Sequence, residues 1–247
     1  LAQGRLNGVD IDLAVLTNVM HEHLDFHGSW ENYRDAKAIM FRMLSTSYRK
    51  TGVLKVAVIN ADDQSYDYFK GIPADKVISY GIQNPADYRA ADIQYQPDQT
   101  EFVVHDTSIS MQLVGEFNIS NTLATISVAH ELGIGWESIQ AGIAAVEMIS
   151  GRMQRIDEGQ DFVAIVDFAH TPNALKRALE AGRTMLPETN KLICVFGSAG
   201  LRDVEKRRLM AETSAQLADM TVLTAEDPRT ESLDDILEFM SQGCISQ

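Results

Sequence analysis

The sequence predicts an α/β protein built of two units, and two observations favour this fold class. After residue 151, short apolar runs alternate with helical segments, an order typical of a parallel sheet covered by helices. In the first part of the chain, nearly continuous apolar runs predict strands that are buried on both faces. The regular alternation of strands and helices begins just after Ser150, so we divide the chain into two domains, 1–150 and 151–247.

The first unit is expected to hold two buried strands, several short β segments and three helices. The buried strands are 11–19 and 53–60, and the helix between them begins after Ser29, a residue type that caps helix N-termini. Short β segments are expected at 76–81, 91–96, 100–106 and 108–115, followed by helices at about 118–132 and 136–146.

The second unit is expected to alternate three strands with three helices in one parallel sheet. The strands are 162–168, 191–197 and 220–225, and the helices begin at Pro172, Val204 and Leu233. Ligands of open parallel sheets bind at the edge formed by the carboxyl ends of the strands. Because polar residues follow all three strands, we expect a ligand site at this edge.

Three polar clusters mark that edge of the second unit. Asp167 and His170 follow the first strand, residues 197–203 follow the second, and residues 226–229 follow the third. The glycines of "GSAGLRD" are a weak phosphate signal by themselves, because the full G-x-G-x-x-G pattern is missing. The neighbouring charged run Lys206–Arg208 is expected to be a solvated helix face.

Composition excludes several functional classes. The 247 residues carry a net charge of −14, so the bulk surface repels nucleic acid and anionic membranes. No apolar run approaches the roughly 18 residues that span a bilayer. Cys194 and Cys244 fit neither a disulfide framework nor metal-type spacing. We expect a cytoplasmic monomer, and a fragment of a longer protein, because the chain opens on leucine and stops just after a helix-like stretch.

Half of the six histidines fall in "HEHLDFHG", residues 21–28, in the loop that leaves the first strand. The spacing is not that of a zincin. His23 and His27 are candidates to face one metal ion, and the alternative is a hydrated loop or a helix cap. An oxygen-rich site with one imidazole suits Mg²⁺ or Mn²⁺ better than zinc.

Lys37 stands where the helix after this loop should present an apolar side chain. Trp30, Tyr33, Met40 and Phe41 form the apolar stripe to which that position belongs. A buried lysine is unfavourable unless it is paired or chemically changed. Either its stem packs while the ammonium reaches solvent, or Lys37 joins the histidine loop in a site.

Asn118 and Asn121 lie three residues apart at the start of a predicted helix and should share a face. An asparagine amide both donates and accepts, which suits the edge of an adenine. The alternative is helix capping, which is the favoured interpretation for Asn118 alone.

Six motifs in order make the chain resemble the Mur ligases, most closely the UDP-N-acetylmuramoyl-tripeptide synthetases. They are "TNVMHEHLDFHGSWENYRDAK", "GEFNISNTLA", "GRM", "VDFAHTPNAL", "VFGSAGLRDVEKRRLM" and "EDPRTE". The resemblance implies an ATPase-type central domain, of which this chain holds the remainder, followed by a Rossmann-like C-terminal domain. It also implies an ATP- and Mg²⁺-dependent ligase that joins a carboxylate to an amine through an acyl phosphate.

The resemblance also assigns roles to individual residues. His23 is implied as a metal ligand, and Lys37, fourteen residues later, as a carbamate that faces Mg²⁺; both belong with Arg152 to the catalytic group. The nucleotide-binding residues are implied to be Asn118 or Asn121 at the adenine, Arg152 at the phosphates, Asp167 at the ribose and His170 beside the nucleotide. The substrate-binding residues are implied to be Arg202, Asp203, Asp227, Pro228, Arg229 and Glu231.

Among these residues, the resemblance implies that Arg229 binds the carboxylate of the incoming diamino acid, as the tripeptide synthetases do at this position. A guanidinium can bind a carboxylate with two parallel hydrogen bonds. The implied partners are a UDP-N-acetylmuramoyl-dipeptide and that diamino acid. Asp227 departs from the family's D-N-P-R pattern, which leaves diaminopimelate and lysine both open. The glycine-rich G-x-x-G-K-[ST] loop and the metal-binding glutamate are also missing from this chain. We therefore expect no ligation by the chain alone.

Three alternatives remain at this point. A related ligase, of the folyl-polyglutamate or cyanophycin type, would keep the ATP chemistry and change the substrate. A non-catalytic paralogue would bind nucleotide or a partner. The missing phosphate loop favours it if the gene starts near Leu1, and the intact His23–Lys37 pair disfavours it. A metal hydrolase built on His21, His23 and His27 is the most distant alternative.

Overall fold

The structure is a computed structural model, and it describes residues 4, 6, 8–19, 28–96, 99–187, 189–201 and 203–245. The chain forms two compact units, Leu1–Glu147 and Met148–Gln247, and each is described by itself. The α/β fold class predicted from the sequence is confirmed in both units.

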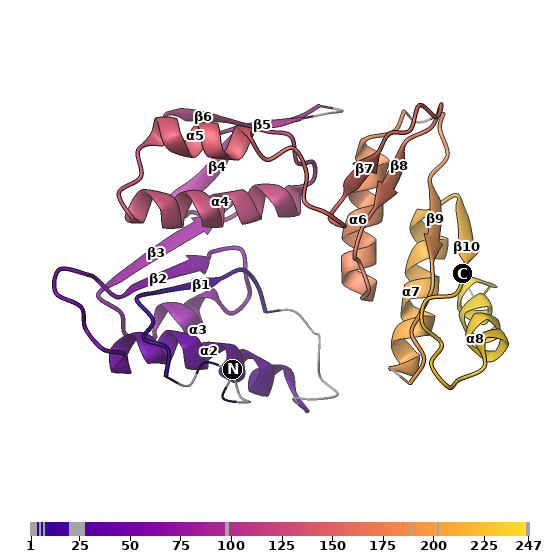
Figure 1. Cartoon of the computed structure of the whole chain (residues 1–247), viewed down its shortest axis with the longest axis horizontal. Helices are drawn as coiled ribbons and strands as arrows, with labels where there is room; N and C mark the ends of the chain where they lie inside the picture. Colours follow the sequence, from indigo (N-terminus) through magenta and orange to yellow (C-terminus); the bar gives the residue numbers. More distant parts are fainter. Residues whose placement is uncertain are drawn as a thin grey trace. The chain divides into compact units, whose positions relative to one another are not determined.

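The first unit is built on one mixed sheet whose strand order follows the chain order (Figure 1). The first four strands pair in parallel, and the last three form an antiparallel meander. The strands are β1 (Leu13–Leu16), β2 (Val56–Asn60), β3 (Lys76–Gly81), β4 (Tyr88–Tyr95), β5 (Thr100–Val104) and β6 (Thr107–Met111).

Helices cover both faces of this sheet (Figure 1). They are α2 (Trp30–Thr46), α3 (Tyr66–Lys70), α4 (Glu116–Glu131) and α5 (Trp136–Ala144). Along β2, Val56 and Val58 pack in the same cluster as α4 and α5, while Ala57 and Ile59 pack with α2 and α3. Successive side chains of a strand point to opposite faces, so β2 is apolar from Val56 to Ile59 because helices cover both of its faces.

A lysine just before β2 is fully buried, and it is not the one that the sequence analysis singled out. Lys55 has no exposed surface. Its ammonium donates to the carbonyls of Ile11 and Tyr48, both at 2.8 Å, and to Oδ1 of Asp12 at 2.9 Å. All three donors of the ammonium are used, which is the condition under which a buried charge is tolerated.

In its described residues, the second unit has two small sheets and three helices, which Figure 1 shows. Its elements are β7 (Gln154–Ile156), β8 (Ala164–Val166), α6 (Pro172–Thr184), β9 (Ile193–Phe196), α7 (Val204–Leu217), β10 (Met220–Leu223) and α8 (Leu233–Ile245). Strands β9 and β10 pair in parallel, as predicted. Leu175, Leu179, Cys194 and Met210 form a core between α6, α7 and β9.

The expectation that 162–168 joins the parallel sheet is wrong within the described residues. The strand is shorter, β8, and it pairs antiparallel with β7. The physical reason is proximity in the chain: β7 lies directly upstream, and Gly159, with φ of 83°, lies in the connection. A three-residue strand of sequence QRI carries too little apolar pattern to be predicted.

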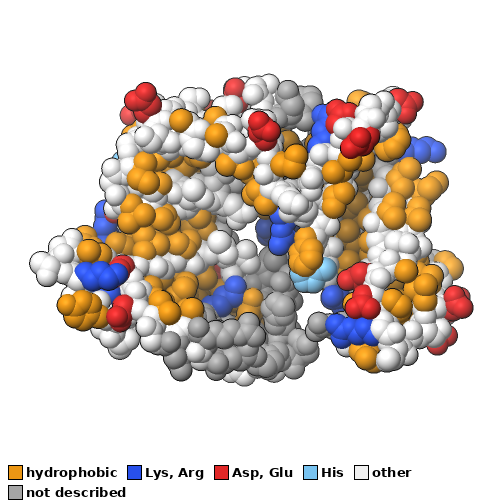
Figure 2. Space-filling view, in the orientation of Figure 1, with side chains coloured by type: hydrophobic (Ala, Val, Ile, Leu, Met, Phe, Trp, Pro, Cys, Tyr) orange, Lys and Arg blue, Asp and Glu red, His pale blue; other side chains and the backbone are white. Residues whose placement is uncertain are grey.

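One face of the β9–β10 pair is apolar and exposed. Ile193 lies opposite Met220, and Val195 lies opposite Val222. All four side chains are exposed, and Figure 2 shows apolar side chains at the surface of this unit. The other face, which includes Cys194, is buried against helices. Within the described residues, no helix is both long and apolar enough to cross a bilayer.

Candidate functional site

Lys37 makes a hydrogen bond to the backbone just after β1. Ser29 caps α2 as predicted, accepting the Asn32 amide at 3.2 Å, and this sets the phase of the helix. Lys37 is half-buried, and its Nζ donates to the carbonyl oxygen of Asn18 at 3.1 Å. The same Nζ lies 4.9 Å from the centre of the Tyr33 ring. The ammonium is therefore fixed beside the segment that leads into the histidine loop.

His21, His23 and His27 lie outside the described residues, so the pairing of His23 with Lys37 stays a prediction. Within the described residues, no group of three or more His, Cys, Asp and Glu side chains is placed to hold a metal. An unmodified ammonium repels a cation, whereas the carbamate that the resemblance implies for Lys37 is an anion that can face one. A carbamate keeps one N–H, and the hydrogen bond to Asn18 would survive the modification.

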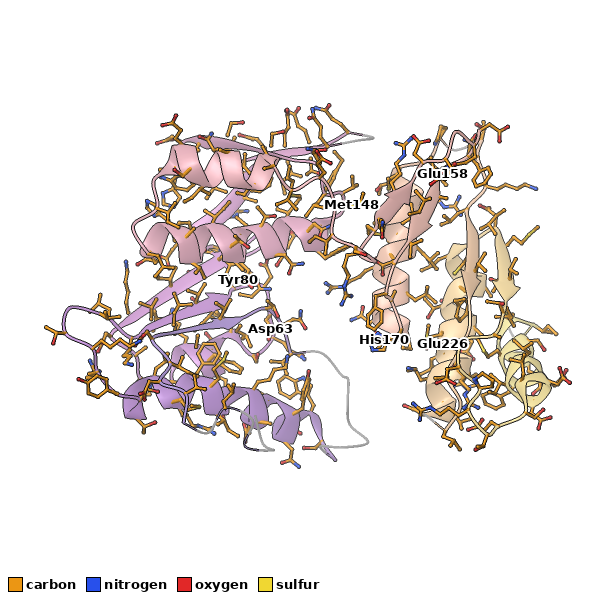
Figure 3. All side chains as sticks on the ribbon, in the orientation of Figure 1. Asp63, Tyr80, Met148, Glu158, His170 and Glu226 are labelled. Atoms are coloured by element: carbon orange, nitrogen blue, oxygen red, sulfur yellow. The ribbon has the colours of Figure 1, made fainter. Side chains whose placement is uncertain are left out.

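The backbone between β1 and the histidine loop is fixed by side chains that the sequence analysis missed. Asn60 donates to the Thr17 carbonyl at 2.8 Å, and Oδ2 of Asp63 accepts the Val19 amide at 2.7 Å. The Tyr80 hydroxyl donates to the Leu16 carbonyl at 2.9 Å. Burial first, and then the nearby charges of Asp63 and Asp62, raises the pKa of Tyr80. Its hydroxyl therefore stays protonated and donates. Figure 3 labels Asp63 and Tyr80. The polar residues Asn60, Asp62 and Asp63 at the end of β2 were the sequence signal from which these contacts could have been predicted.

Asn118 and Asn121 differ in their surroundings. Asn118 is buried, and its Nδ2 donates to the Val114 carbonyl at 2.8 Å, whereas Asn121 is exposed. The capping interpretation of Asn118 is wrong, because α4 begins after Gly115 and the amide binds a carbonyl. Gly115 has φ of 104°, and the turn it makes places Asn118 inside the first turn of the helix.

In the second unit, Arg152, Asp167 and His170 gather around a fourth residue, Phe168. The two oxygens of Asp167 accept the Met153 and Ala169 amides, each at 2.8 Å, which ties "GRM" to the end of β8. The guanidinium of Arg152 lies 5.0 Å from the centre of the Phe168 ring. The His170 ring lies 4.9 Å from the same ring (Figure 3 labels His170). Phe168 is exposed, so this group presents an aromatic surface beside a cation.

The loop after β9 packs backbone-to-backbone on the loop after β10. We define the first as loop A, residues 197–203, and the second as loop B, residues 224–231. The Gly200 amide donates to the Asp227 carbonyl at 2.8 Å. A β-carbon on Gly197 would stand 2.5 Å from the Thr224 carbonyl oxygen. These glycines serve loop packing, and no phosphate is needed to explain them.

The substrate residues implied by the resemblance are distributed over these two loops. Asp203 caps α7 by accepting the Lys206 amide at 3.2 Å, and Arg202 lies outside the described residues. Arg229 is exposed with φ of 51°, and its Nε lies 3.7 Å from Oδ2 of Asp227. Pro228 lies directly against Gly200.

The expectation of a solvated Lys206–Arg208 face is wrong for Arg207. Its side chain is 4% exposed, and it bonds Glu231 at 2.8 Å and the Ala199 carbonyl at 3.1 Å. The reason is that both loops fold over this side of α7. Arg208, in contrast, is 41% exposed and pairs with Glu205 and Glu212 on its own helix.

Comparison with known proteins shows which family has this sequence and fold. The profile of the Mur ligase middle domain matches residues 1–129, and the profile described as Mur ligase, glutamate ligase domain matches residues 151–246. The chain belongs to the Mur ligase family. The resemblance stated from the motifs is therefore confirmed.

Among curated relatives of this Mur ligase chain are two bacterial proteins. The UDP-N-acetylmuramoyl-L-alanyl-D-glutamate–2,6-diaminopimelate ligase of Geobacillus kaustophilus is 38% identical over 251 aligned residues, covering 100% of this chain and 51% of the relative. UDP-N-acetylmuramyl-tripeptide synthetase 2 of Oceanobacillus iheyensis is 39% identical, covering 99% of this chain and 50% of the relative. The chain thus spans about half the length of the curated relatives it matches.

Solved Mur ligase structures share the fold. A UDP-N-acetylmuramoyl-L-alanyl-D-glutamate–2,6-diaminopimelate ligase superposes with a TM-score of 0.62 at 36% identity, covering 98% of this chain and 49% of that one. MurF from Acinetobacter baumannii gives a TM-score of 0.73 at 19% identity, covering 95% of this chain and 49% of that one. The latter supports the fold alone.

Proposed function

We propose that this chain is part of an ATP-dependent ligase that adds a diamino acid to a UDP-N-acetylmuramoyl-dipeptide in peptidoglycan synthesis. The observation that carries the proposal is the presentation of Arg229, exposed beside Asp227 on a loop whose backbone is fixed against Gly200. A guanidinium fixed in this way binds a carboxylate in a defined direction, and the neighbouring acid attracts an ammonium. An α-amino acid carries both groups.

The reaction divides into two steps. A carboxylate oxygen of the dipeptide attacks the γ-phosphorus of ATP, which forms an acyl phosphate and releases ADP. The amino group of the incoming amino acid then attacks the acyl carbon, loses a proton, and phosphate leaves. In this proposal His23 and a carbamate on Lys37 would hold Mg²⁺, and the ion would supply positive charge to the reaction.

The remaining residues bind and orient the nucleotide in this proposal. The exposed amide of Asn121 contacts the adenine edge, and Asn118 supports the helix turn through its bond to Val114. The cation of Arg152 reaches the phosphates. Asp167 binds the ribose with the acceptor capacity that its two backbone hydrogen bonds leave free, and His170 lies beside it.

Diaminopimelate is the amino acid we favour, and lysine is the alternative to be tested. The relatives named above are diaminopimelate ligases or tripeptide synthetases, which is the support for this choice. Asp227 stands where the family's D-N-P-R pattern has asparagine, and a carboxylate favours an ammonium more strongly than an amide does. We further propose that the protein acts as a cytoplasmic monomer.

The test uses the full-length protein that contains this chain. ADP release is measured with the UDP-linked dipeptide and, in turn, diaminopimelate, lysine, glutamate and no amino acid. Release that requires the dipeptide and one diamino acid supports the proposal. Stoichiometric ATP binding without turnover under any of these conditions would favour the non-catalytic paralogue. ADP release that required glutamate together with a folate in place of the dipeptide would favour a folyl-polyglutamate type of ligase.

A further inference from the structure

One partly buried ion pair joins α7, the helix that follows loop A, to loop B. Nη1 of Arg207 lies 2.8 Å from Oε2 of Glu231, and the two side chains are 4% and 28% exposed. Arg207 comes from α7, which follows loop A, and Glu231 closes loop B. The pair therefore links the loops on which the family resemblance places the amino-acid site.

The Arg207 guanidinium uses separate nitrogens for the two loops. Nη1 reaches Glu231, and Nη2 donates to the Ala199 carbonyl at 3.1 Å. Only a planar fork with several donors makes both contacts in fixed directions. A lysine ammonium at this position reaches one partner or the other, so charge alone does not replace the arginine.

Glu231 is turned towards loop A. One carboxylate oxygen pairs with Arg207, and the other accepts the amide hydrogen of Leu201. Leu201 and Arg229 have φ of 52° and 51°, a backbone region that is unfavourable for residues other than glycine. Such conformations persist where the surrounding contacts hold them. Glu231 supplies such a contact at the Leu201 amide, and Arg207 supplies one at the Ala199 carbonyl of the same loop.

We propose that Arg207 is a positioning residue of the amino-acid site and that Glu231 is its partner, not a substrate ligand. The ion pair holds loop A and loop B in one arrangement, so that Arg229 and Asp227 meet the amino acid already oriented. This assignment rests on the proposed function for its catalytic consequence. The locking of the loops themselves is independent of any substrate.

The first measurement compares steady-state constants in the full-length protein. The variants are Arg207→Lys, Arg207→Met and Glu231→Gln, and the matched control is Arg208→Met, one residue along the same helix and paired only within it among the described residues. We expect the KM for the amino acid to rise about tenfold or more in Arg207→Met and less in Arg207→Lys. The KM for ATP should stay within about twofold, and Arg208→Met should match the wild type.

Two kinetic outcomes would overturn the assignment. Equal losses for all three substrates would indicate a general folding defect, and an unchanged amino-acid KM in Arg207→Met would leave the pair without a role in positioning. Direct ligation by Glu231 predicts a different pattern, in which Glu231→Gln impairs amino-acid binding while Arg207→Met does not.

A second measurement keeps the inference separate from the proposed function. Amide hydrogen exchange is followed for peptides covering loops A and B in the full-length protein without substrate. Arg207→Met should accelerate exchange of the Gly200 and Leu201 amides, which bond to loop B, and leave β1–β6 unchanged. If no amino acid supports turnover in the wild type, the proposed function is wrong. The exchange measurement would still show whether the Arg207–Glu231 pair fixes loops A and B. Unchanged exchange would refute the locking.

Discussion

Gly200 and Pro228 are in contact through their backbones: a β-carbon on Gly200 would stand 2.0 Å from the Pro228 carbonyl oxygen. Gly200→Ala should therefore separate the two loops and destabilise the second unit by about 2 kcal/mol or more. Calorimetry measures this, because both tryptophans, Trp30 and Trp136, report only on the first unit. The matched control is Gly142→Ala in α5, where nothing lies within 4 Å of an added β-carbon and the change should be neutral or slightly stabilising. An unaltered second-unit transition in Gly200→Ala would refute this packing.

Lys55 should be among the most sensitive charged residues of the first unit. Lys55→Met removes a fully buried ammonium and leaves two carbonyls and Oδ1 of Asp12 without the donor that Lys55 supplies, so we expect destabilisation of about 3 kcal/mol. Urea unfolding followed by tryptophan fluorescence checks it. Lys50→Met is the control, because Lys50 pairs with the same Asp12 but is 50% exposed. Comparable losses of unfolding free energy in the two variants would show that the burial of Lys55 does not cause the destabilisation.

The Arg207–Glu231 pair makes the stability of the second unit depend on pH. Arg207 first, and then the Leu201 amide, lowers the pKa of Glu231 below its usual 4.5. A lowered pKa means that the contribution is complete above pH 4.5 and is lost as the pH falls through the folded-state value. The unfolding temperature of the second unit should thus exceed that of Glu231→Gln at pH 7, and the gap should close below pH 4.5. A gap that widened on acidification would contradict this sign.

Lys37→Ala should abolish turnover in the full-length ligase, by at least about a hundredfold, if its carbamate faces Mg²⁺. Short carboxylic acids should restore part of the activity, because they return a carboxylate to the space the side chain leaves. Lys70→Ala is the control, since Lys70 is an exposed lysine stacked on Tyr66 at the end of α3. Full activity in Lys37→Ala would remove this residue from the mechanism.

The predictions succeeded where a local pattern determines the outcome. The Ser29 cap, the buried strand β2 and the parallel β9–β10 pair follow from residue type and apolar runs, and the structure has all three. They failed where a distant partner decides. The sequence around Arg207 is that of a solvated helix face, but in the structure Glu231 pairs with this side chain and it is buried. The burial of Lys55 was not predicted at all, because its partners come from two other segments of the chain.

The distinction also holds for the candidate site. Ordered motifs predict which residues form the site, but the contacts that orient them depend on tertiary structure. Examples are Phe168, which lies beside both Arg152 and His170, and Asp63, which accepts the Val19 amide. No periodicity in the sequence encodes such contacts.

The strand order of the first sheet has a consequence for the kinetics of folding. Each strand pairs with the strand before it in the chain, and β5 and β6 are joined by only His105 and Asp106. Closing so short a loop loses little chain entropy, whereas β1 and β2 pair only across α2. The antiparallel half should therefore form early and act as the template on which the parallel strands, and with them the segment beside Lys37, are assembled last.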